Sequence, residues 1–150
     1  MKLSKKAEYA LRALVAMGRQ AVGATFSIQD LAREESIPVK FLEQILLALK
    51  NGGLLRSRRG VGGGYQLLLP STEISLRQVV ELIDGPFQPI PCCEAALGRR
   101  AVCECGVRGS CGLGRTLAGL ETLVRDWMDE TTVAHVIAHE AAQEVVSFEI

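Results

Sequence analysis

The chain has 150 residues, of which 48% are apolar and 23% charged, and its 17 Lys and Arg residues balance 17 Asp and Glu residues. This composition suits a globular protein with one domain, or a small domain with an appendage, that can bury a core. No apolar run approaches the length of a membrane span, and the charged start MKLSKKAEYALRAL lacks the pattern of a signal peptide, so we expect a cytoplasmic protein without a membrane partner.

The net charge of zero hides two halves of opposite sign. Through Gln66 the sequence carries 11 Lys and Arg residues against 5 Asp and Glu, whereas from Leu67 onward it carries 6 against 12. A basic first half predicts a polyanionic partner for that half alone. Because basic faces are often only solvated, charge by itself leaves nucleic-acid binding and a solvated surface both open.

Three helices are predicted in the basic half. Apolar residues recur at helical spacing over residues 4–20, and Ser27 can cap a short second helix over residues 28–35. Pro38 suits the start of a third helix over residues 38–50. This third helix has an apolar stripe, made of Leu42, Ile45, Leu46 and Leu49. The opposite face carries Lys40, Glu43 and Gln44.

Two strand-like runs, residues 54–59 and 65–70, flank the sequence GVGGG and predict a hairpin. Three helices followed by a basic hairpin make a winged helix-turn-helix, whose third helix enters the major groove of DNA. The hairpin then offers Arg56, Arg58 and Arg59 to phosphates or to a narrow minor groove. The alternative is that the glycines only close the hairpin and the arginines are solvated.

The acidic half is predicted to be helical around one irregular segment. A helix over residues 75–85 precedes a loop rich in Pro, Gly and Cys over residues 86–112. Such a long irregular insert is typical of a functional segment. A long helix then begins near Gly112, and a shorter one follows over residues 133–145. The apolar face of the long helix is wide enough for a partner helix and comprises Leu113, Leu117, Leu120, Leu123, Val124, Trp127 and Met128.

Three sequence stretches resemble one known family. They are MKLSKKAEYALRAL, IPVKFLEQILLALKNGGLLRSRRGVGGGYQL and ISLRQVVELIDGP, and together they span the chain from its start to about Pro86. The chain is similar here to the winged-helix regulators that include IscR, NsrR and CymR. The pair FLEQIL and RSRRGVGGGY is highly specific for that family.

The resemblance implies a fold, a partner and contact residues. It implies a homodimer joined through the long C-terminal helix, which represses or activates promoters at palindromic sites in double-stranded DNA. By position, the major-groove contacts fall on Lys40, Glu43 and Gln44, and the wing arginine falls on Arg59. Several family members hold an iron–sulfur cluster through three cysteines in the loop before the long helix.

All five cysteines of this chain lie in one segment, Cys92 to Cys111. Thiolates are soft ligands that suit iron–sulfur clusters and zinc, and the interspersed glycines allow tight turns. Cys105 and Cys111 match the spacing of two family ligands, whereas the upstream cysteines lie farther away than usual. We therefore expect a two-iron or four-iron cluster with these ligands: Cys93, Cys103, Cys105 and Cys111, with Cys92 and the Glu8 of a partner subunit as alternatives.

The fourth ligand is open. Where IscR has a histidine, three residues after the last cysteine, this chain has Gly114; other members use an acidic residue at the place of Glu8. Glu8 has the alternative of being solvated or paired with Lys5 or Arg12. Zinc binding, a metal-free thiol sensor and simple packing of the cysteines also stay open.

We expect a mainly α fold with a small β-hairpin, divided into a winged helix-turn-helix over residues 1–85, a cysteine-rich sensor loop over residues 86–112 and a dimerisation helix with its tail over residues 113–150. The expected function is a homodimeric transcriptional regulator, a repressor, whose DNA affinity is set by an iron–sulfur cluster that senses redox state, nitric oxide or iron status. An enzyme is not expected, because GVGGG leads into a strand rather than into a helix that could bind a nucleotide.

Overall fold

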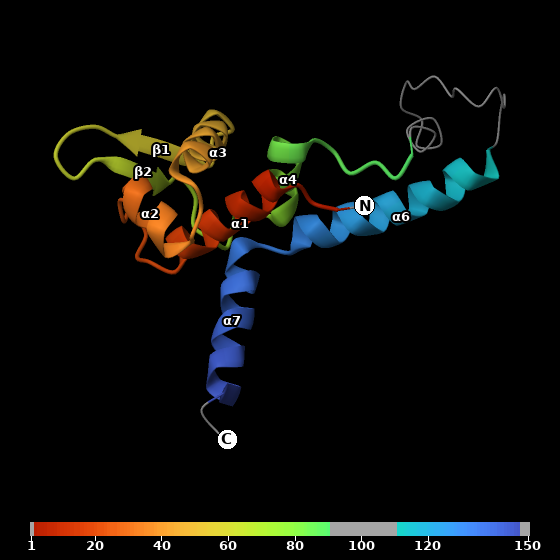
Figure 1. The fold of residues 1–150 in the computed structure, drawn as a ribbon. Coiled ribbons are helices and arrows are strands. Elements are labelled where there is room, and N and C mark those ends of the chain that lie inside the picture. Colours follow the sequence, from red (N-terminus) through yellow and green to blue (C-terminus); the bar gives the residue numbers. More distant parts are fainter. Residues whose placement is uncertain (1, 91–110, 148–150) are drawn as a thin grey trace.

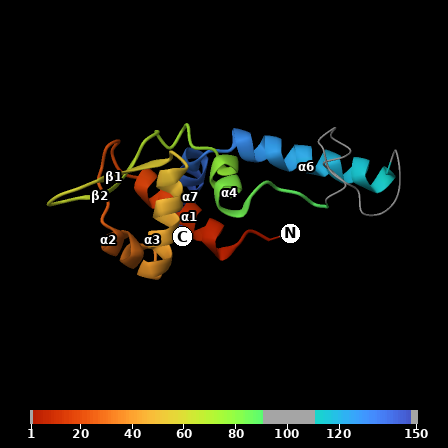
Figure 2. The same cartoon turned by 90° about the horizontal axis from the view of Figure 1, so that it is seen from above.

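The computed structural model describes residues 2–90 and 111–147. Within these residues the fold is mainly helical with one two-stranded antiparallel hairpin, as the sequence predicts. The hairpin lies at one end of the molecule and the long helix α6 extends toward the other (Figures 1 and 2). The elements in chain order are α1 (Lys5–Gly18), α2 (Ile28–Glu34), α3 (Val39–Asn51), β1 (Leu55–Arg58), β2 (Gly64–Leu67), α4 (Leu76–Asp84), α6 (Gly112–Glu130) and α7 (Val133–Ser147).

Helix α1 is the centre of the fold and packs against α3, α4 and α7. Its central alanines let neighbouring helices approach closely, and Leu14 and Met17 fill the space between them, both almost fully buried. The predicted apolar stripe of α3 is also completely buried. Each such leucine or isoleucine contributes roughly 1.5–3 kcal/mol on burial, so the orientation of α3 is fixed by its inner face.

Serine caps fix the helix starts. The hydroxyl of Ser27 accepts a hydrogen bond from the Asp30 amide, which confirms the cap predicted for the second helix. Ser4, expected inside the first helix, is instead the cap of α1 and accepts from the Ala7 amide. At α4, Ser75 and Gln78 form a reciprocal capping box.

A third segment, the one before α2, pairs with the hairpin, and the sequence pattern did not predict this. Phe26 and Tyr65 exchange two backbone hydrogen bonds, each 2.9 Å long, so the segment before α2 lies alongside β2. Gly64 has to be glycine at this junction, because a Cβ atom there would lie 2.1 Å from the Phe26 carbonyl oxygen. The tip residue Gly62 has φ of +73°, which favours glycine as well. The glycines of GVGGG therefore have structural reasons within the hairpin itself.

The junction between α6 and α7 is bonded to the segment that begins α4. The Leu76 amide donates to the Thr131 carbonyl at 2.8 Å, and the Val133 amide donates to the Ile74 carbonyl at 2.9 Å. Helix α7 then packs on α1 and is longer than the stretch predicted from sequence. The C-terminal end of α6 is thus attached to the helix-turn-helix through its backbone.

Replacing Gly64 by alanine is expected to lower the free energy of unfolding by about 1–3 kcal/mol, because the new methyl group collides with backbone rather than with a flexible side chain. Urea denaturation measures this. Gly119→Ala is the matched control, since nothing lies within 4 Å of its added Cβ and alanine favours the helix. Equal stabilities for the two variants would contradict the role given to the Phe26 contact.

Candidate functional site

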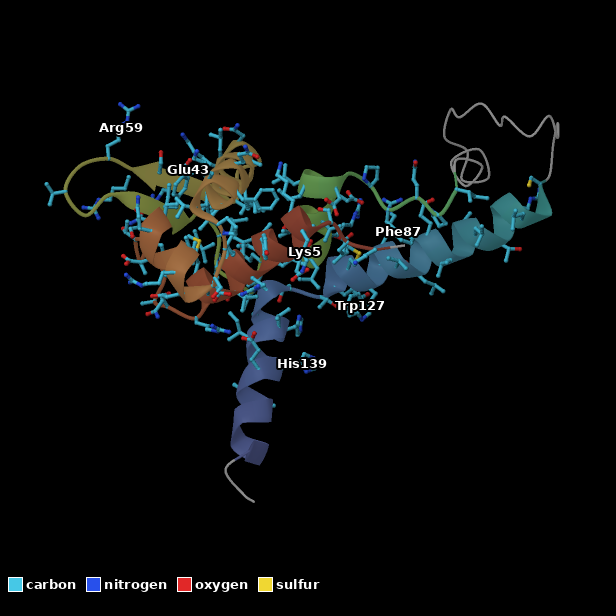
Figure 3. All side chains as sticks on the ribbon, in the orientation of Figure 1. Lys5, Glu43, Arg59, Phe87, Trp127 and His139 are labelled. Atoms are coloured by element: carbon cyan, nitrogen blue, oxygen red, sulfur yellow. The ribbon has the colours of Figure 1, made fainter. Side chains whose placement is uncertain are left out.

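The outer face of α3 is a polar surface open to solvent. Lys40, Glu43 and Gln44 are all exposed, as their spacing predicts, and the exposed Val39 and Leu47 flank them on the same helix. Glu43 and Arg59 lie along one edge of the domain, with Arg59 projecting from the turn between the strands (Figure 3). A helix of this width with polar and apolar groups on one exposed face matches the major groove of B-DNA.

The turn between α2 and α3 is held by a residue of α1. Arg12 donates through Nε to a carboxylate oxygen of Glu35 at 3.3 Å, and one of its terminal nitrogens donates to the Glu35 backbone carbonyl. The next residue, Ser36, has φ of +53°, an uncommon conformation for a side chain other than glycine. Arg12 therefore stabilises the strained turn that sets the direction of α3.

An aromatic contact joins the face of α1 that carries Arg12 to the first turn of α3. The rings of Tyr9 and Phe41 meet edge to face with centroids 5.8 Å apart. Arg12 and Lys5 each lie 5.7 Å from the centroid of the Tyr9 ring. The start of α3 is thus fixed by α1 through side chains as well as through the core.

The hairpin presents three arginines. Arg56 and Arg58 lie on β1 and Arg59 follows it, and all three are exposed. The Nε of Arg56 donates to the side-chain oxygen of Gln66, directly across the hairpin, at 2.9 Å. These arginines and Lys40 of α3 are therefore exposed cations of the three helices and the hairpin.

Glu8 is paired within its own helix. The Lys5 ammonium lies 2.7 Å from its carboxylate, which is one of the alternatives left open by the sequence. The hydrogen bond from Lys5 lowers the pKa of the Glu8 carboxyl, so Glu8 is a half-exposed carboxylate at neutral pH. A carboxylate of this kind can still exchange its lysine for a metal, because an exposed ion pair is weak.

Cys111 is the cysteine that the structure describes. It is the N-cap of α6, half-buried, and its sulfur accepts a hydrogen bond from the Gly114 amide at 3.4 Å. A cysteine sulfur is a soft ligand for iron or zinc, and this one lies at the end of the cysteine segment, directly before α6. Its position therefore fits a soft-metal ligand. The other expected cysteine ligands, Cys92, Cys93, Cys103 and Cys105, lie outside the described residues.

Among the described residues, no three His, Cys, Asp or Glu side chains converge as a metal site. His135 accepts a hydrogen bond from the Thr132 amide at the start of α7, and His139 lies exposed one turn later. No described helix is both long and apolar enough to cross a bilayer.

The apolar face predicted on α6 is partly buried and partly exposed to solvent. Met128 is buried against α4, so it does not belong to the exposed face of α6. Leu113, Leu120, Leu123 and Trp127 are exposed; we call these four residues the α6 stripe. Their exposed fractions reach 70% at Leu123, which is unusual for side chains of this size in a monomer.

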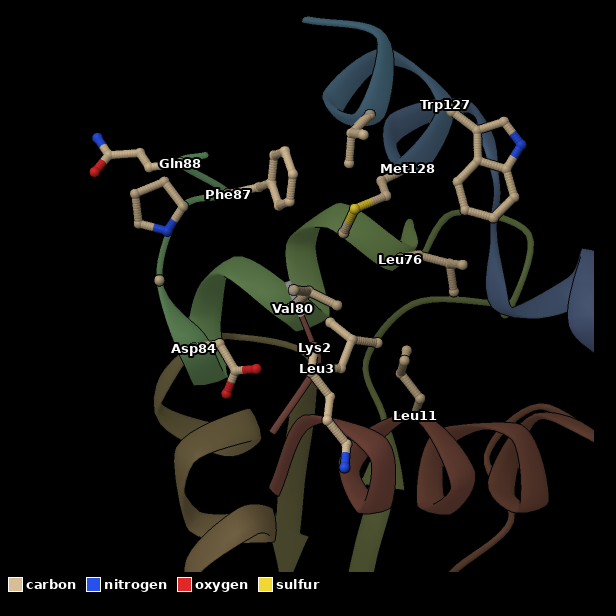
Figure 4. A pocket seen from close by; sticks show the side chains of 13 residues that line it. Lys2, Leu3, Leu11, Leu76, Val80, Asp84, Phe87, Gln88, Trp127 and Met128 are labelled. Carbon is tan, nitrogen blue, oxygen red and sulfur yellow. The ribbon is translucent and has the colours of Figure 1, made fainter. Parts of the chain in front are cut away.

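An apolar cavity of about 480 Å³ adjoins the α6 stripe (Figure 4). Its walls come from the chain start, α1, α4, the segment after α4 and α6. Its apolar side chains include Leu3, Leu11, Val80, Phe87, Trp127 and Met128. Trp127 belongs to both the cavity and the stripe, so the two form one continuous apolar surface.

An ion-pair cluster joins α4 to α6. Arg77 donates to Glu81 at 2.9 Å on its own helix and to Asp129 of α6 at 2.5 Å. Arg125 of α6 lies 4.0 Å from Glu81 and 3.8 Å from the fully buried Glu121. This cluster, with the backbone bonds at the α6–α7 junction, fixes the angle between α6 and the helix-turn-helix.

Three side chains of this site were not predicted as such: Gln66, Glu35 and Arg77. Gln66 had a weak signal, a lone amide in an otherwise apolar strand. Glu35 and Arg77 had none, because exposed charged residues in helices are common and their partners lie 23 and 52 residues away along the chain. Such pairs become visible only when the fold is known.

Three packed helices, a polar exposed α3 and an arginine-bearing hairpin define a winged helix-turn-helix protein. The chain belongs to the Rrf2 family, described as iron-dependent transcriptional regulators, whose pattern it matches over residues 3–139. Its relatives are transcriptional regulators rather than enzymes, as the sequence predicts.

Individual relatives agree with this family. A candidate HTH-type transcriptional regulator of Mycobacterium tuberculosis is 46% identical over 90 residues, which are 60% of this chain and 56% of that protein. The chain thus matches little more than half the length of that relative. The regulator IscR of Cereibacter sphaeroides is 28% identical over 93% of this chain and 89% of its own length. The structure of CymR from B. subtilis, the global cysteine regulator, covers 93% of this chain and 98% of its own with a TM-score of 0.75 at 22% identity, a likeness of fold.

Replacing Arg12 by methionine is expected to lower the free energy of unfolding by about 1 kcal/mol, because it removes a charged hydrogen bond to the carbonyl of a strained turn. Arg33→Met is the matched control: its ion pair with Asp30 is exposed and spans only three residues, so about 0.5 kcal/mol or less is expected. Thermal unfolding of both variants makes the comparison. Equal losses would show that Arg12 has no special role in the turn.

Proposed function

We propose that this protein is a homodimeric, DNA-binding repressor whose affinity for its operator is set by an iron–sulfur cluster in the cysteine loop. The observation that carries the DNA-binding half is the joint exposure of Lys40, Glu43 and Gln44 on α3 beside the arginines of the hairpin. Membership of the Rrf2 family supports the regulatory role.

In the proposed complex, α3 lies in the major groove. Lys40 suits the acceptors of guanine, Gln44 suits adenine, and the Glu43 carboxylate suits the amino group of cytosine. The wing arginines Arg56, Arg58 and Arg59 neutralise phosphates or enter a narrow minor groove. Phosphate contacts then supply affinity, and the three α3 residues supply sequence preference.

The proposed dimer uses the α6 stripe and the cavity beside it. A second copy of this chain is the natural occupant, because the stripe and the cavity form one surface and an isologous pairing covers both copies at once. Glu8 lies on α1 one turn before Leu11, which lines the cavity. In an antiparallel pairing of the two α6 helices, the partner's Cys111 end would lie beside the C-terminal half of this α6, where the cavity and α1 meet. In that arrangement Glu8 would be a ligand supplied across the dimer.

The proposed cluster is held by cysteines of the loop over residues 86–112. Cys111 presents its sulfur at the start of α6, and Cys93, Cys103 and Cys105 complete the set, with Cys92 and the partner's Glu8 as alternatives. The cluster would supply a centre that reacts with oxidants and nitric oxide and depends on iron supply. The contribution of this chain is mechanical. Cys111 lies at the start of α6, and the ion pair that joins Arg77 of α4 to Asp129 lies near the other end of α6.

The α6 helix converts the state of the loop into the geometry of DNA binding. Its 19 residues span about 28 Å as a rigid rod. A tilt at the Cys111 end turns the helix-turn-helix that is fixed to the other end. Because half-sites must be about 34 Å or a multiple apart, a small change in spacing between two α3 helices lowers operator affinity steeply.

A metal-free thiol sensor on the same scaffold is the second candidate. The five clustered cysteines support it, and so does the likeness of fold to CymR, the global cysteine regulator of B. subtilis. In that case disulfide formation in the loop would tilt α6 in the same way.

Glu43→Ala is expected to relax the preference for one base pair in each half-site, because the hydrogen bond from cytosine to the carboxylate supplies about 1–3 kcal/mol of discrimination. Selection from a random duplex library, followed by competition binding, measures the preference of each variant. The wild-type protein is expected to select a palindrome.

Glu34→Ala is the matched control for that experiment. It removes the same charge from an exposed site on α2, so general electrostatic effects are shared. The control is expected to keep the wild-type preference. A wild-type preference in Glu43→Ala would remove Glu43 from the interface, and the absence of any selected sequence would contradict the DNA-binding function.

Protein purified without oxygen is expected to contain iron and sulfide and to lose both in Cys111→Ser, because serine is a poor ligand for soft metals. His139→Ala is the control and is expected to keep the metal.

Operator binding by iron-loaded and iron-free protein should differ by at least about tenfold, equivalent to about 1.4 kcal/mol. A colourless wild-type protein that forms disulfides would favour the thiol sensor, and equal operator affinities would contradict the switch.

A further inference from the structure

Gln66 is a buried amide inside the DNA-facing hairpin. It lies on β2 with only 5% of its surface exposed, although both strands are short and the hairpin is mostly solvated. Burying an amide without hydrogen bonds costs several kcal/mol in stability, so the side chain needs partners. Its nitrogen donates to the Gly23 carbonyl at 3.0 Å and to the Thr25 hydroxyl at 2.5 Å.

These two hydrogen bonds determine the orientation of the Gln66 side-chain amide. Both loop partners act as acceptors here, so the NH2 group must point toward the loop before α2 and the oxygen must point the other way. That oxygen accepts from the Nε of Arg56 at 2.9 Å. Gln66 therefore links the loop before α2 to an exposed arginine.

The hydrogen bond to Gln66 restricts the conformation of the Arg56 side chain but uses only one of its N–H groups. An exposed arginine loses up to about 2 kcal/mol of side-chain entropy when a ligand immobilises it. Here one of its five N–H donors is already held, and the contact with Gln66 leaves the four donors on the terminal nitrogens for another acceptor. A guanidinium presented in this way suits a phosphate diester.

We propose that Gln66 is a positioning residue for DNA binding: it orients the Arg56 guanidinium toward one backbone phosphate before the complex forms. The inference rests on the proposed function, since it requires that the hairpin meets DNA. It gives the wing a preorganised contact in addition to the arginine at its tip, and it explains why a polar residue occupies a buried place opposite Arg56.

Four variants test the proposal by equilibrium binding to a duplex selected by the wild-type protein: Gln66→Met, Arg56→Met, the double variant, and Thr25→Val. Arg56→Met is expected to reduce the slope of log K against log salt by about 0.9 for each phosphate that the variant no longer neutralises. Gln66→Met is expected to weaken binding by roughly two- to tenfold, the range for immobilising one long side chain on binding. In the Arg56→Met background it should add nothing.

Thr25→Val separates positioning from anchoring of the hairpin. It removes one loop contact but leaves the bond between Gln66 and Arg56, so binding close to wild type is expected. NMR of the arginine Nε–H groups in the DNA-free protein gives an independent readout. The Arg56 signal should be protected from exchange in the wild type and in Thr25→Val, and lose protection in Gln66→Met.

The outcomes are distinguishable. The positioning role alone is overturned if Gln66→Met weakens binding equally in the wild-type and the Arg56→Met backgrounds. It is also overturned if the Arg56 Nε–H signal of the wild-type protein is not protected from exchange. An unchanged salt slope in Arg56→Met removes Arg56 from the interface, which overturns the proposal together with that part of the proposed function. A loss confined to the background that contains Arg56 supports it.

Discussion

The attachment of α6 to the helix-turn-helix is the constraint on which the proposed mechanism depends. Two backbone hydrogen bonds, Leu76 to Thr131 and Val133 to Ile74, bind the end of α6 to the start of α4, and the Arg77–Asp129 pair adds a charged contact beside them. Backbone bonds leave little freedom of rotation at this joint. Because Cys111 lies at the far end of the same helix, any change of angle there is carried to the DNA-binding domain.

Inside the DNA-binding domain, the contact residues are held in place by side chains that do not contact DNA in the proposed complex. The buried stripe of α3 fixes its axis, Arg12 holds the strained turn before it, and Gln66 holds Arg56 on the hairpin. In the proposed mechanism this domain moves as a unit. The geometry left to adjust in a dimer is then the separation and tilt of two such units, which is what operator half-sites measure.

The helices and the hairpin could be predicted well from the sequence, whereas the contacts between distant segments could not. Both results have one physical reason. Helix periodicity, serine caps and glycine turns are local, so α1 to α4 and the hairpin could be located from a few neighbouring residues. The Phe26–Tyr65 bridge, the Arg12–Glu35 pair and the Gln66 contacts join distant segments and depend on how the helices pack. The inward turn of Met128, expected on the partner face, has the same origin. The ligand set of the cysteine loop remains a prediction, with Cys111 well placed at the start of α6.

The most direct measurement is the distance between the two α3 helices of the dimer in its iron-loaded and iron-free forms. Spin labels attached through a non-natural amino acid at Lys50, which is exposed at the end of α3, leave all five cysteines intact. Double electron–electron resonance then reports the separation. We expect two different mean distances, with the form that binds its operator near a whole number of DNA turns. Identical distance distributions in the two forms would contradict the proposed switch.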